Sequence, residues 1–181
     1  MSIKKQIKTG DKSLYYWAVA RISLGFIFFW AFLDKAFGLG FSTCRDAVSG
    51  AVETMCGKAW LAGGSPTEGF LQFGTKGPLA ETFQAVAGNP VVDVLFIAGL
   101  GLIGLALILG IGIKVATISG SLLMLMMWSA SLLPANNPIL DEHIIYIIVL
   151  LGVLSANKNQ KWGLGRAWTK QPLVKRLSIL E

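Results

Sequence analysis

The chain has few charged residues, a single histidine and only two cysteines among its 181 residues. Charged residues make up 14% of the sequence and hydrophobic residues 54%, a balance outside that of ordinary soluble domains. The length is that of a single domain. Because several long apolar runs contain so few charges, the composition indicates an integral membrane protein.

The shortage of metal-binding side chains argues against several cofactor classes. A single histidine excludes a b-type haem held by paired histidines, and no Cys/His spacing suits zinc or an iron–sulfur cluster. The glycines between residues 99 and 112 do not form a GxGxxG motif after a strand, so nucleotide binding is not indicated. Met124, Met126 and Met127 are more typical of helix packing than of copper ligation. We therefore expect no metal or haem.

Positive charges gather near both ends of the chain: Lys4, Lys5, Lys8 and Lys12 at one, and Lys158, Lys161, Arg166, Lys170, Lys175 and Arg176 at the other. Beside apolar spans, such clusters mark the cytoplasmic side rather than a nucleic-acid partner. The first apolar run is too long for a signal peptide and lacks a small-residue cleavage site. We therefore expect a multi-pass protein of the cell membrane with both termini in the cytoplasm.

Four apolar runs are long enough to cross a bilayer core of ~30 Å as helices. We expect spans at about residues 14–37, 91–111, 115–133 and 138–155, which form an all-α four-transmembrane-helix bundle in one membrane domain, 1–181. Residues 1–13 form a basic arm, and residues 156–181 a basic cytoplasmic tail with Trp162 and Trp168 as interfacial anchors. Tyr15, Tyr16 and Trp17 form an aromatic belt, beyond which Arg21 is expected to snorkel to the inner interface.

The glycine-rich segment 38–89 is too long for an idle loop, and we expect it on the outer side. Ser65-Pro66-Thr67-Glu68 has the pattern of a capping box with proline at the first helical position. Gly77-Pro78 begins a second helix, which Gly88 ends. These signals predict two short amphipathic helices on the outer surface. Asn89-Pro90 is expected to cap the second span, whose glycines allow close helix contact.

Both cysteines, Cys44 and Cys56, lie in this outer segment, where disulfides persist. On one straight helix they would stand about 18 Å apart, so a bridge requires a bend, for which Ser49-Gly50 is the candidate. We favour a structural disulfide. A redox-active pair is the alternative, although nothing beside these residues resembles CxxC.

The candidate site begins with the only histidine, His143, beside Asp141 and Glu142 at the start of the fourth span, where Asn137 is the expected N-cap and Pro138 the first helical residue. Ionisable groups beside lipid must pair, protonate or meet water. Further side chains are expected at the same outer level: Asp34, Lys35, Asp93, Trp128, Ser129 and Ser131, with Tyr146 one turn below the histidine. We expect one polar cluster that opens outward. The alternative is that these charges merely mark helix ends, where charges are tolerated.

The segments RISLGFIFFWAFLDK (Arg21–Lys35), WLAGGSPTEGFL (Trp60–Leu71), GPLAETFQAVAG (Gly77–Gly88), NNPILDEHIIY (Asn136–Tyr146) and WGLGRAW (Trp162–Trp168) resemble the DoxX/DoxD family. The resemblance extends over nearly the whole chain from Trp17 onward. It implies a four-helix membrane bundle and, for some members, transfer of electrons from thiosulfate to a membrane quinone, with tetrathionate as product. Such a reaction needs an outer anion site, with Lys35, His143, Arg45 and Lys58 as the candidate cations, and a quinone pocket in the polar cluster.

Three hypotheses follow. The first is the membrane subunit of a quinone-linked oxidoreductase, such as thiosulfate:quinone oxidoreductase, with quinone as cofactor and catalytic roles for His143, Asp141, Glu142, Asp34 and Lys35. The second is a non-catalytic subunit that anchors a larger complex through its glycine-rich second span. The third is a carrier of small molecules or lipids. Membrane lipid, a second oxidoreductase subunit and a further copy of the chain are the expected partners, and nucleic acid is not.

Overall fold

A computed structural model describes residues 3–134, 137 and 139–180, which form helices and loops without a named strand. The major helices are α1 (Ile3–Phe37), α4 (Pro90–Leu109), α5 (Ile113–Ala130) and α6 (Glu142–Ala156). The short α-helices are α2 (Glu68–Phe73), α3 (Ala80–Gln84), α7 (Gly165–Trp168) and α8 (Pro172–Arg176). The 3-10 turns are η1 (Trp60–Ala62), η2 (Gly77–Leu79), η3 (Asn157–Asn159) and η4 (Ser178–Leu180). The chain is thus all-helical in its described part, as expected.

Three helical segments are long and apolar enough to cross a membrane: Lys12–Phe37, Pro90–Leu109 and Ile113–Ala130. Their outward faces carry exposed apolar side chains, such as Phe26, Leu102 and Ile118, each more than half exposed. Such a surface suits lipid and not water. The fourth expected span is shorter, because α6 has 15 residues and is therefore only about 22 Å long.

The start of α4 confirms the cap predicted from the sequence. The Asn89 side chain accepts a hydrogen bond from the N–H of Val91 (2.9 Å), and Pro90 is the first helical residue. At the other end, Gly110 adopts a left-handed conformation with φ 70°, which stops α4 and begins the tight turn into α5. Lys114 lies in the first turn of α5.

The start of α6 differs from the expectation. Asp141 is the N-cap, and its Oδ1 accepts hydrogen bonds from the N–H groups of His143 (3.0 Å) and Ile144 (3.4 Å). Asn137, expected in that role, accepts from the N–H groups of Ile139 and Leu140 and so forms a turn before the helix. The expectation for Pro138 lies outside the described residues. A carboxylate four residues later than Asn137 caps the helix, so α6 begins at Glu142.

The N-terminal arm and the third span also differ from the expected boundaries. Helix α1 begins at Ile3, so the basic arm is itself helical and runs directly into the apolar part of the same helix. Helix α5 ends at Ala130 and not near Leu133. Charged residues in the arm did not stop the helix because lysine is a good helix former.

The glycines of α4 bring this helix into close contact with α1. A Cβ atom on Gly104 would lie 2.6 Å from the backbone nitrogen of Phe29, and one on Gly25 of α1 would lie 2.8 Å from that of Ile108. The core around this contact includes Leu24, Phe28, Leu100, Ile103, Leu107, Ile113, Ala116, Met124, Leu150 and Val153. The small residues are therefore used for packing within the bundle.

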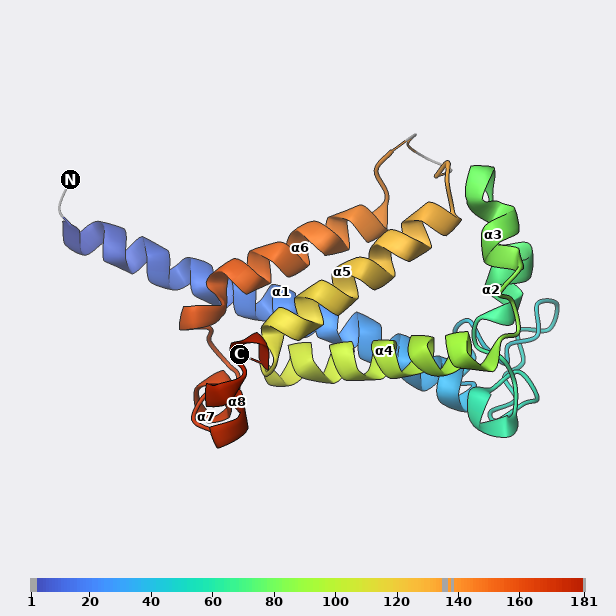
Figure 1. Ribbon diagram of the computed structural model, residues 1–181, viewed down its shortest axis with the longest axis horizontal. Coiled ribbons are helices and arrows are strands. Elements are labelled where there is room, and N and C mark those ends of the chain that lie inside the picture. Colours follow the sequence, from blue (N-terminus) through green and yellow to red (C-terminus); the bar gives the residue numbers. More distant parts are fainter. Residues whose placement is uncertain (1–2, 135–136, 138, 181) are drawn as a thin grey trace.

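The molecule has two distinct ends (Figure 1). Helices α2 and α3 and the loop that contains the cysteines lie at one end, shown on the right, where α1 finishes and α4 begins. Helices α7 and α8 lie at the other end, near the turn between α4 and α5, and the N-terminal part of α1 projects beyond the bundle on that side. Both basic termini are therefore at the same end.

Candidate functional site

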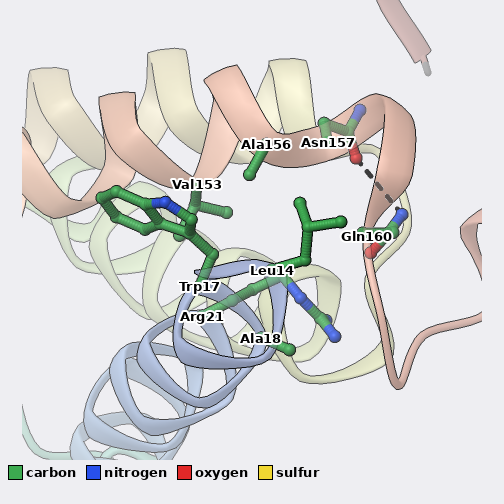
Figure 2. A pocket seen from close by; sticks show the side chains of 8 residues that line it. All are labelled: Leu14, Trp17, Ala18, Arg21, Val153, Ala156, Asn157 and Gln160. Carbon is green, nitrogen blue, oxygen red and sulfur yellow. Dashed lines mark hydrogen bonds between the residues drawn. The ribbon is translucent and has the colours of Figure 1, made fainter. Parts of the chain in front are cut away.

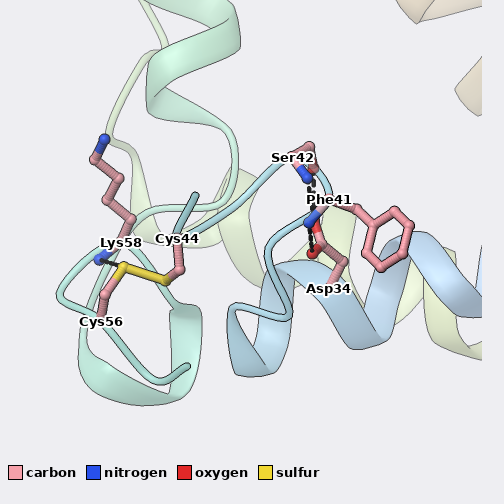
Figure 3. The surroundings of a disulfide bond; sticks show 6 residues. All are labelled: Asp34, Phe41, Ser42, Cys44, Cys56 and Lys58. Atoms are coloured by element: carbon pink, nitrogen blue, oxygen red, sulfur yellow. Dashed lines mark hydrogen bonds between the residues drawn. A yellow bond between two sulfur atoms is a disulfide. The ribbon is translucent and has the colours of Figure 1, made fainter. Parts of the chain in front are cut away.

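The Asp34 carboxylate fastens the first loop to the end of α1. Its oxygens accept hydrogen bonds from the N–H groups of Phe41 and Ser42 (2.9 Å each) and from the Ser42 hydroxyl (2.7 Å). Figure 3 shows these contacts beside the disulfide. Lys35 Nζ donates to the same hydroxyl at 3.2 Å. Asp34 is 2% exposed, so this carboxylate is buried but well supplied with donors.

A groove of about 340 Å³ opens beside Asp34, with an aromatic lining and one polar end. Its lining consists of Phe26, Ile27, Trp30, Ala31, Asp34, Phe41 and Ser42. The Trp30 and Phe41 rings meet edge to face at 5.0 Å, and the Phe26 ring stacks on Trp30 at 5.9 Å. Because Phe26, Ile27 and Phe41 are each 45% exposed or more, the groove opens on the outward apolar surface of α1.

Asp93, in the first turn of α4, holds a different part of the same loop. Its Oδ1 accepts hydrogen bonds from the hydroxyls of Ser65 (2.8 Å) and Thr67 (2.5 Å). Ser65 Oγ accepts in turn from the N–H of Glu68 (3.0 Å), which is the first half of the expected capping box. Helix α2 begins at Glu68, so Pro66 precedes the helix and is not its first residue. The polar contacts of Asp93 thus position α2.

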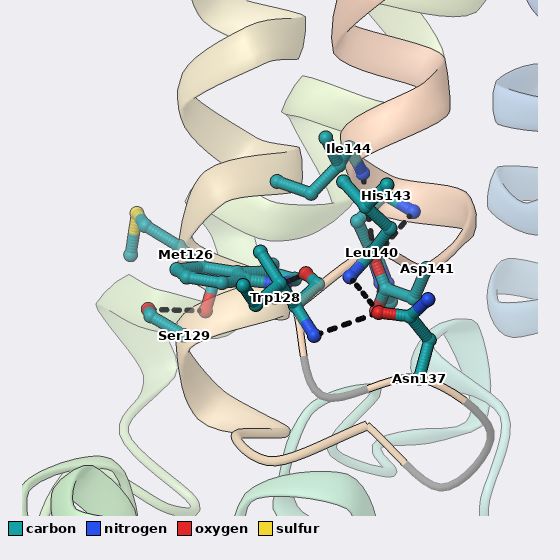
Figure 4. A network of polar contacts seen from close by, with 9 residues as sticks. Met126, Trp128, Ser129, Asn137, Leu140, Asp141, His143 and Ile144 are labelled. Atoms are coloured by element: carbon teal, nitrogen blue, oxygen red, sulfur yellow. Dashed lines mark hydrogen bonds and ion pairs between the residues drawn. The ribbon is translucent and has the colours of Figure 1, made fainter.

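The histidine pairs with its neighbouring carboxylate at the start of α6. His143 Nδ1 lies 2.8 Å from Asp141 Oδ2, an arrangement in which Nδ1–H donates and Nε2 is left to face other groups. Figure 4 shows this pair and the nearby Trp128, whose indole N–H donates to the carbonyl of Ile139 at 2.9 Å. Glu142 is exposed. Ligand atoms of Asp141, Glu142 and His143 lie within 4.8 Å of one another, but these are adjacent residues of one helix start.

The structure brings together Asp34 with Lys35, and Asp141 with His143. Across the described ranges, no hydrogen bond or ion pair joins these two groups to each other or to Asp93. The groove contains Asp34 but neither Asp93 nor His143. Tyr146 is half-buried against the hydrophobic core. The carboxylates of Asp34, Asp93 and Asp141 are therefore each satisfied by their own surroundings.

The expected disulfide joins Cys44 and Cys56, whose Cα atoms are 5.7 Å apart (Figure 3). The bend that permits it lies where the sequence placed it: Gly50 has φ +70°, and its N–H donates to the carbonyl of Asp46. Hydrogen bonds from the N–H and hydroxyl of Ser49 hold the pKa of Asp46 below its ordinary value. The disulfide closes the loop 44–56, which follows the groove residues Phe41 and Ser42 in the chain.

Two proposed cations, Arg45 and Lys58, are exposed on the disulfide loop. The backbone of Arg45 pairs with Val52, and the N–H of Lys58 lies 3.4 Å from Cys56 Sγ. Neither side chain lines the groove. Their role in anion binding remains a prediction.

The expectation that Arg21 snorkels to the inner interface is wrong, because this side chain is buried and only 2% exposed. Its Nη1 donates to the carbonyls of Leu107 and Ile108, at the C-terminal end of α4. Its Nη2 donates to those of Lys161 (3.1 Å) and Trp162 (2.9 Å). The guanidinium therefore joins α1, α4 and the tail, at the negative end of the α4 dipole.

A small cavity lies beside Arg21, lined by Leu14, Trp17, Ala18, Val153, Ala156, Asn157 and Gln160 (Figure 2). Gln160 Nε2 donates to the carbonyl of Gly110 at 2.9 Å. Arg21 Nε and Gln160 Oε1 are buried without a hydrogen-bond partner. The sequence signal for this arrangement was the close grouping of glycines near residues 110–112 and 163–165, because a Cβ at Gly110 would collide with Arg21 and Gln160.

No protein-family model, curated protein or solved structure matches this chain.

Proposed function

We propose that the protein is the membrane subunit of a quinone-linked oxidoreductase, and that the quinone ring binds in the aromatic groove beside Asp34. The observation that carries the proposal is the combination of an aromatic lining, one polar end and an opening toward lipid. A membrane quinone has the complementary parts: a flat ring, carbonyl oxygens that accept hydrogen bonds, and a long apolar tail.

The aromatic lining suits the ring of a quinone. Phe26, Trp30 and Phe41 contribute faces and edges within the distances at which aromatic groups attract one another. The exposed side of Phe26 and Ile27 leaves room for the tail to pass into the bilayer. Binding pockets typically combine such an apolar lining with a few polar groups that fix orientation.

The donor proposed for a quinone carbonyl is Lys35, which does not itself line the groove but is hydrogen-bonded to Ser42, which does. The Ser42 hydroxyl and the Lys35 ammonium are hydrogen-bonded to one another beside the buried Asp34 carboxylate. A quinone carbonyl that approaches this end can accept a hydrogen bond from Lys35. The ammonium has three N–H donors, and only one of them is needed for the bond to Ser42. As the ring gains electrons, its oxygens become more basic, and the ammonium stabilises the developing negative charge.

The reaction balances with thiosulfate as donor. Two thiosulfate ions form the sulfur–sulfur bond of tetrathionate and release two electrons, and the quinone takes these electrons with two protons to become quinol. We propose that thiosulfate binds at the end of the molecule that carries the disulfide. In this arrangement the chain crosses the membrane four times and both termini lie in the cytoplasm. The candidate cations of that end, Arg45 and Lys58, are exposed and suit a dianion.

The alternative of a non-catalytic anchoring subunit relies on the glycines of the second span, two of which pack inside the bundle. The glycines at positions 101 and 104 of α4 contact Phe32 and Phe29 of α1, so they are not available for a partner. A subunit that binds quinone but needs a second protein to receive electrons remains compatible with the groove. A lipid carrier would use the same groove without electron transfer.

The test compares quinone reduction by thiosulfate in proteoliposomes for the wild type and for Lys35→Ala. Losing the ammonium should lower the rate at least tenfold, as expected when a donor to a developing oxyanion is removed. Lys76→Ala, an exposed lysine at the same end, is the control and should retain the wild-type rate. Equal rates for all three proteins would exclude Lys35 from the site. If only the protein's natural complex is active, the same variants are assayed within it.

A further inference from the structure

The tail, residues 157–180, is folded against the bundle and does not hang free of it. The N–H of Leu164 donates to the carbonyl of Leu109 at 2.8 Å, and Lys114 Nζ donates to that of Ser178 at 2.7 Å. The Trp168 indole closes the segment on itself by donating to the carbonyl of Leu180. Together with the contacts of Arg21, these bonds fix the tail beside the end of α4 and the start of α5.

The charge of this segment has one sign. Residues 157–180 include six basic residues and no aspartate or glutamate. Five of the basic side chains are exposed: Lys158, Arg166, Lys170, Lys175 and Arg176. A positive surface with no acidic residues among it attracts anions and is screened by salt.

Large apolar side chains are interleaved with these cations. Trp162, Leu164, Leu173, Leu177 and Ile179 are between 48% and 61% exposed. A surface that is both basic and apolar suits neither bulk water nor the hydrocarbon core, but it fits the boundary between them.

The level of that boundary is marked independently by α1. Tyr15 contacts the Trp162 ring at 5.3 Å, and Lys161 Nζ lies 5.5 Å from the centre of the Tyr15 ring. Tyr16 is 76% exposed next to it. Aromatic side chains at the end of an apolar span lie among lipid headgroups. The tail is therefore held at headgroup depth by its contact with the aromatic belt.

We infer that residues 157–180 form a binding surface for the phosphate headgroups of anionic phospholipids. In this arrangement Trp162 and the exposed leucines enter the headgroup layer, while Arg166, Lys170, Lys175 and Arg176 reach lipid phosphates. Arginine binds phosphate with paired N–H groups, and lysine adds a point charge. This inference does not depend on the proposed quinone chemistry, since the surface lies at the opposite end of the bundle.

The experiment reconstitutes the full chain in nanodiscs that contain phosphatidylcholine with a minor fraction of brominated phosphatidylglycerol or brominated phosphatidylcholine. Bromine quenches nearby tryptophan, and the chain has six, so the difference in quenching between a protein and its Trp162→Phe counterpart reports which lipid lies next to the tail. In the wild type, the brominated anionic lipid should quench more than the brominated neutral lipid at the same fraction. The preference should fall between about 0.15 M and 1 M salt, because the Debye length shrinks from ~8 Å to ~3 Å.

The test variant replaces Arg166, Lys170, Lys175 and Arg176 with glutamine. Each cation near an anionic surface changes the binding constant roughly fivefold, so this variant should lose at least about tenfold in its preference for the anionic lipid. The control variant, Arg45→Gln with Lys58→Gln and Lys76→Gln, removes exposed cations at the other end and should keep the wild-type preference.

Three results would overturn the inference. One is an unchanged lipid preference in the tail variant, and another is an equal loss in the control variant. The third is a wild-type preference that does not respond to salt, a measurement that needs no variant. A short RNA added to the nanodiscs should not displace the anionic lipid; displacement would reassign the surface to nucleic acid.

Discussion

A buried guanidinium held by backbone carbonyls is the residue-scale feature that organises the basic end of the molecule. Arg21 donates to the carbonyls of four residues, two at the end of α4 and two in the tail. Carbonyls at a helix C-terminus lack partners within the helix, and here one side chain supplies them. The cost of burying the charge is offset by these bonds and by the dipole of α4.

Replacing Arg21 with methionine should destabilise the protein strongly, because buried carbonyls would lose their donors. We expect a loss of about 3 kcal/mol, since hydrogen bonds from charged groups contribute ~1.5–3 kcal/mol each and are not additive. Arg21→Lys retains the charge but cannot reach all four carbonyls, so its stability should lie between those of the wild type and Arg21→Met. Thermal unfolding in detergent, followed by circular dichroism, checks the order. A methionine variant as stable as wild type would contradict this account of the residue.

The carboxylates show how far residue types could be interpreted from sequence. Asp34, Asp93 and Asp141 were correctly placed near helix ends, and each needs hydrogen-bond donors there. Their partners could not be predicted, because Ser42, Ser65 and Thr67 belong to loops whose path depends on the whole fold. Each of these carboxylates is hydrogen-bonded to nearby N–H or hydroxyl groups instead of joining a shared cluster. Such groups stabilise a carboxylate without bringing like charges together.

At the scale of the helices, the contact between α1 and α4 depends on the absence of side-chain bulk. The glycine pattern indicated close packing from the sequence but did not identify the neighbour. The position of each glycine relative to α1 or α5 decides whether a methyl group fits.

Adding a methyl group should therefore have opposite effects at two glycines of α4. Gly104→Ala should destabilise the bundle, because the new Cβ would lie 2.6 Å from the backbone of Phe29, which cannot move alone. Gly99→Ala should be neutral or stabilising by up to about 1 kcal/mol, since its Cβ would be 4.0 Å from Leu123 and alanine favours helices. Unfolding curves of both variants test the contrast. Equal effects would mean that helix propensity, and not packing, governs these positions.

The helix boundaries illustrate what sequence patterns leave open. Asn89 and Pro90 set the start of α4 correctly because cap and proline agree there. At the start of α6 the expected cap was Asn137, and the capping role of Asp141, four residues later, was not predicted. The later one caps the helix and leaves α6 with 15 residues.

At the scale of the whole molecule, the distribution of charge and the disulfide favour one direction across a membrane. Both basic termini lie at one end and the Cys44–Cys56 bridge at the other (Figure 1). Cytoplasmic loops favour lysine and arginine, whereas disulfides persist outside the cytoplasm. The proposed orientation satisfies both rules.

Labelling of single added cysteines in cells tests this orientation. Thr82→Cys, exposed on α3, should react with a membrane-impermeant maleimide in intact cells. Thr169→Cys, exposed beside α7, should react only after the membrane is permeabilised. The native cysteines form a disulfide and remain unreactive, so the unaltered protein is the blank. The reverse pattern would invert the proposed topology, including the side on which the electron donor binds.

The most direct measurement of the central claim is cross-linking with a photoreactive quinone analogue in membranes, followed by peptide mass spectrometry. We predict adducts within residues 26–42, on the groove lined by Phe26, Trp30 and Phe41, and we predict that excess natural quinone suppresses them. Adducts concentrated within residues 128–146, around His143, or adducts that natural quinone does not suppress, would contradict quinone binding in the groove.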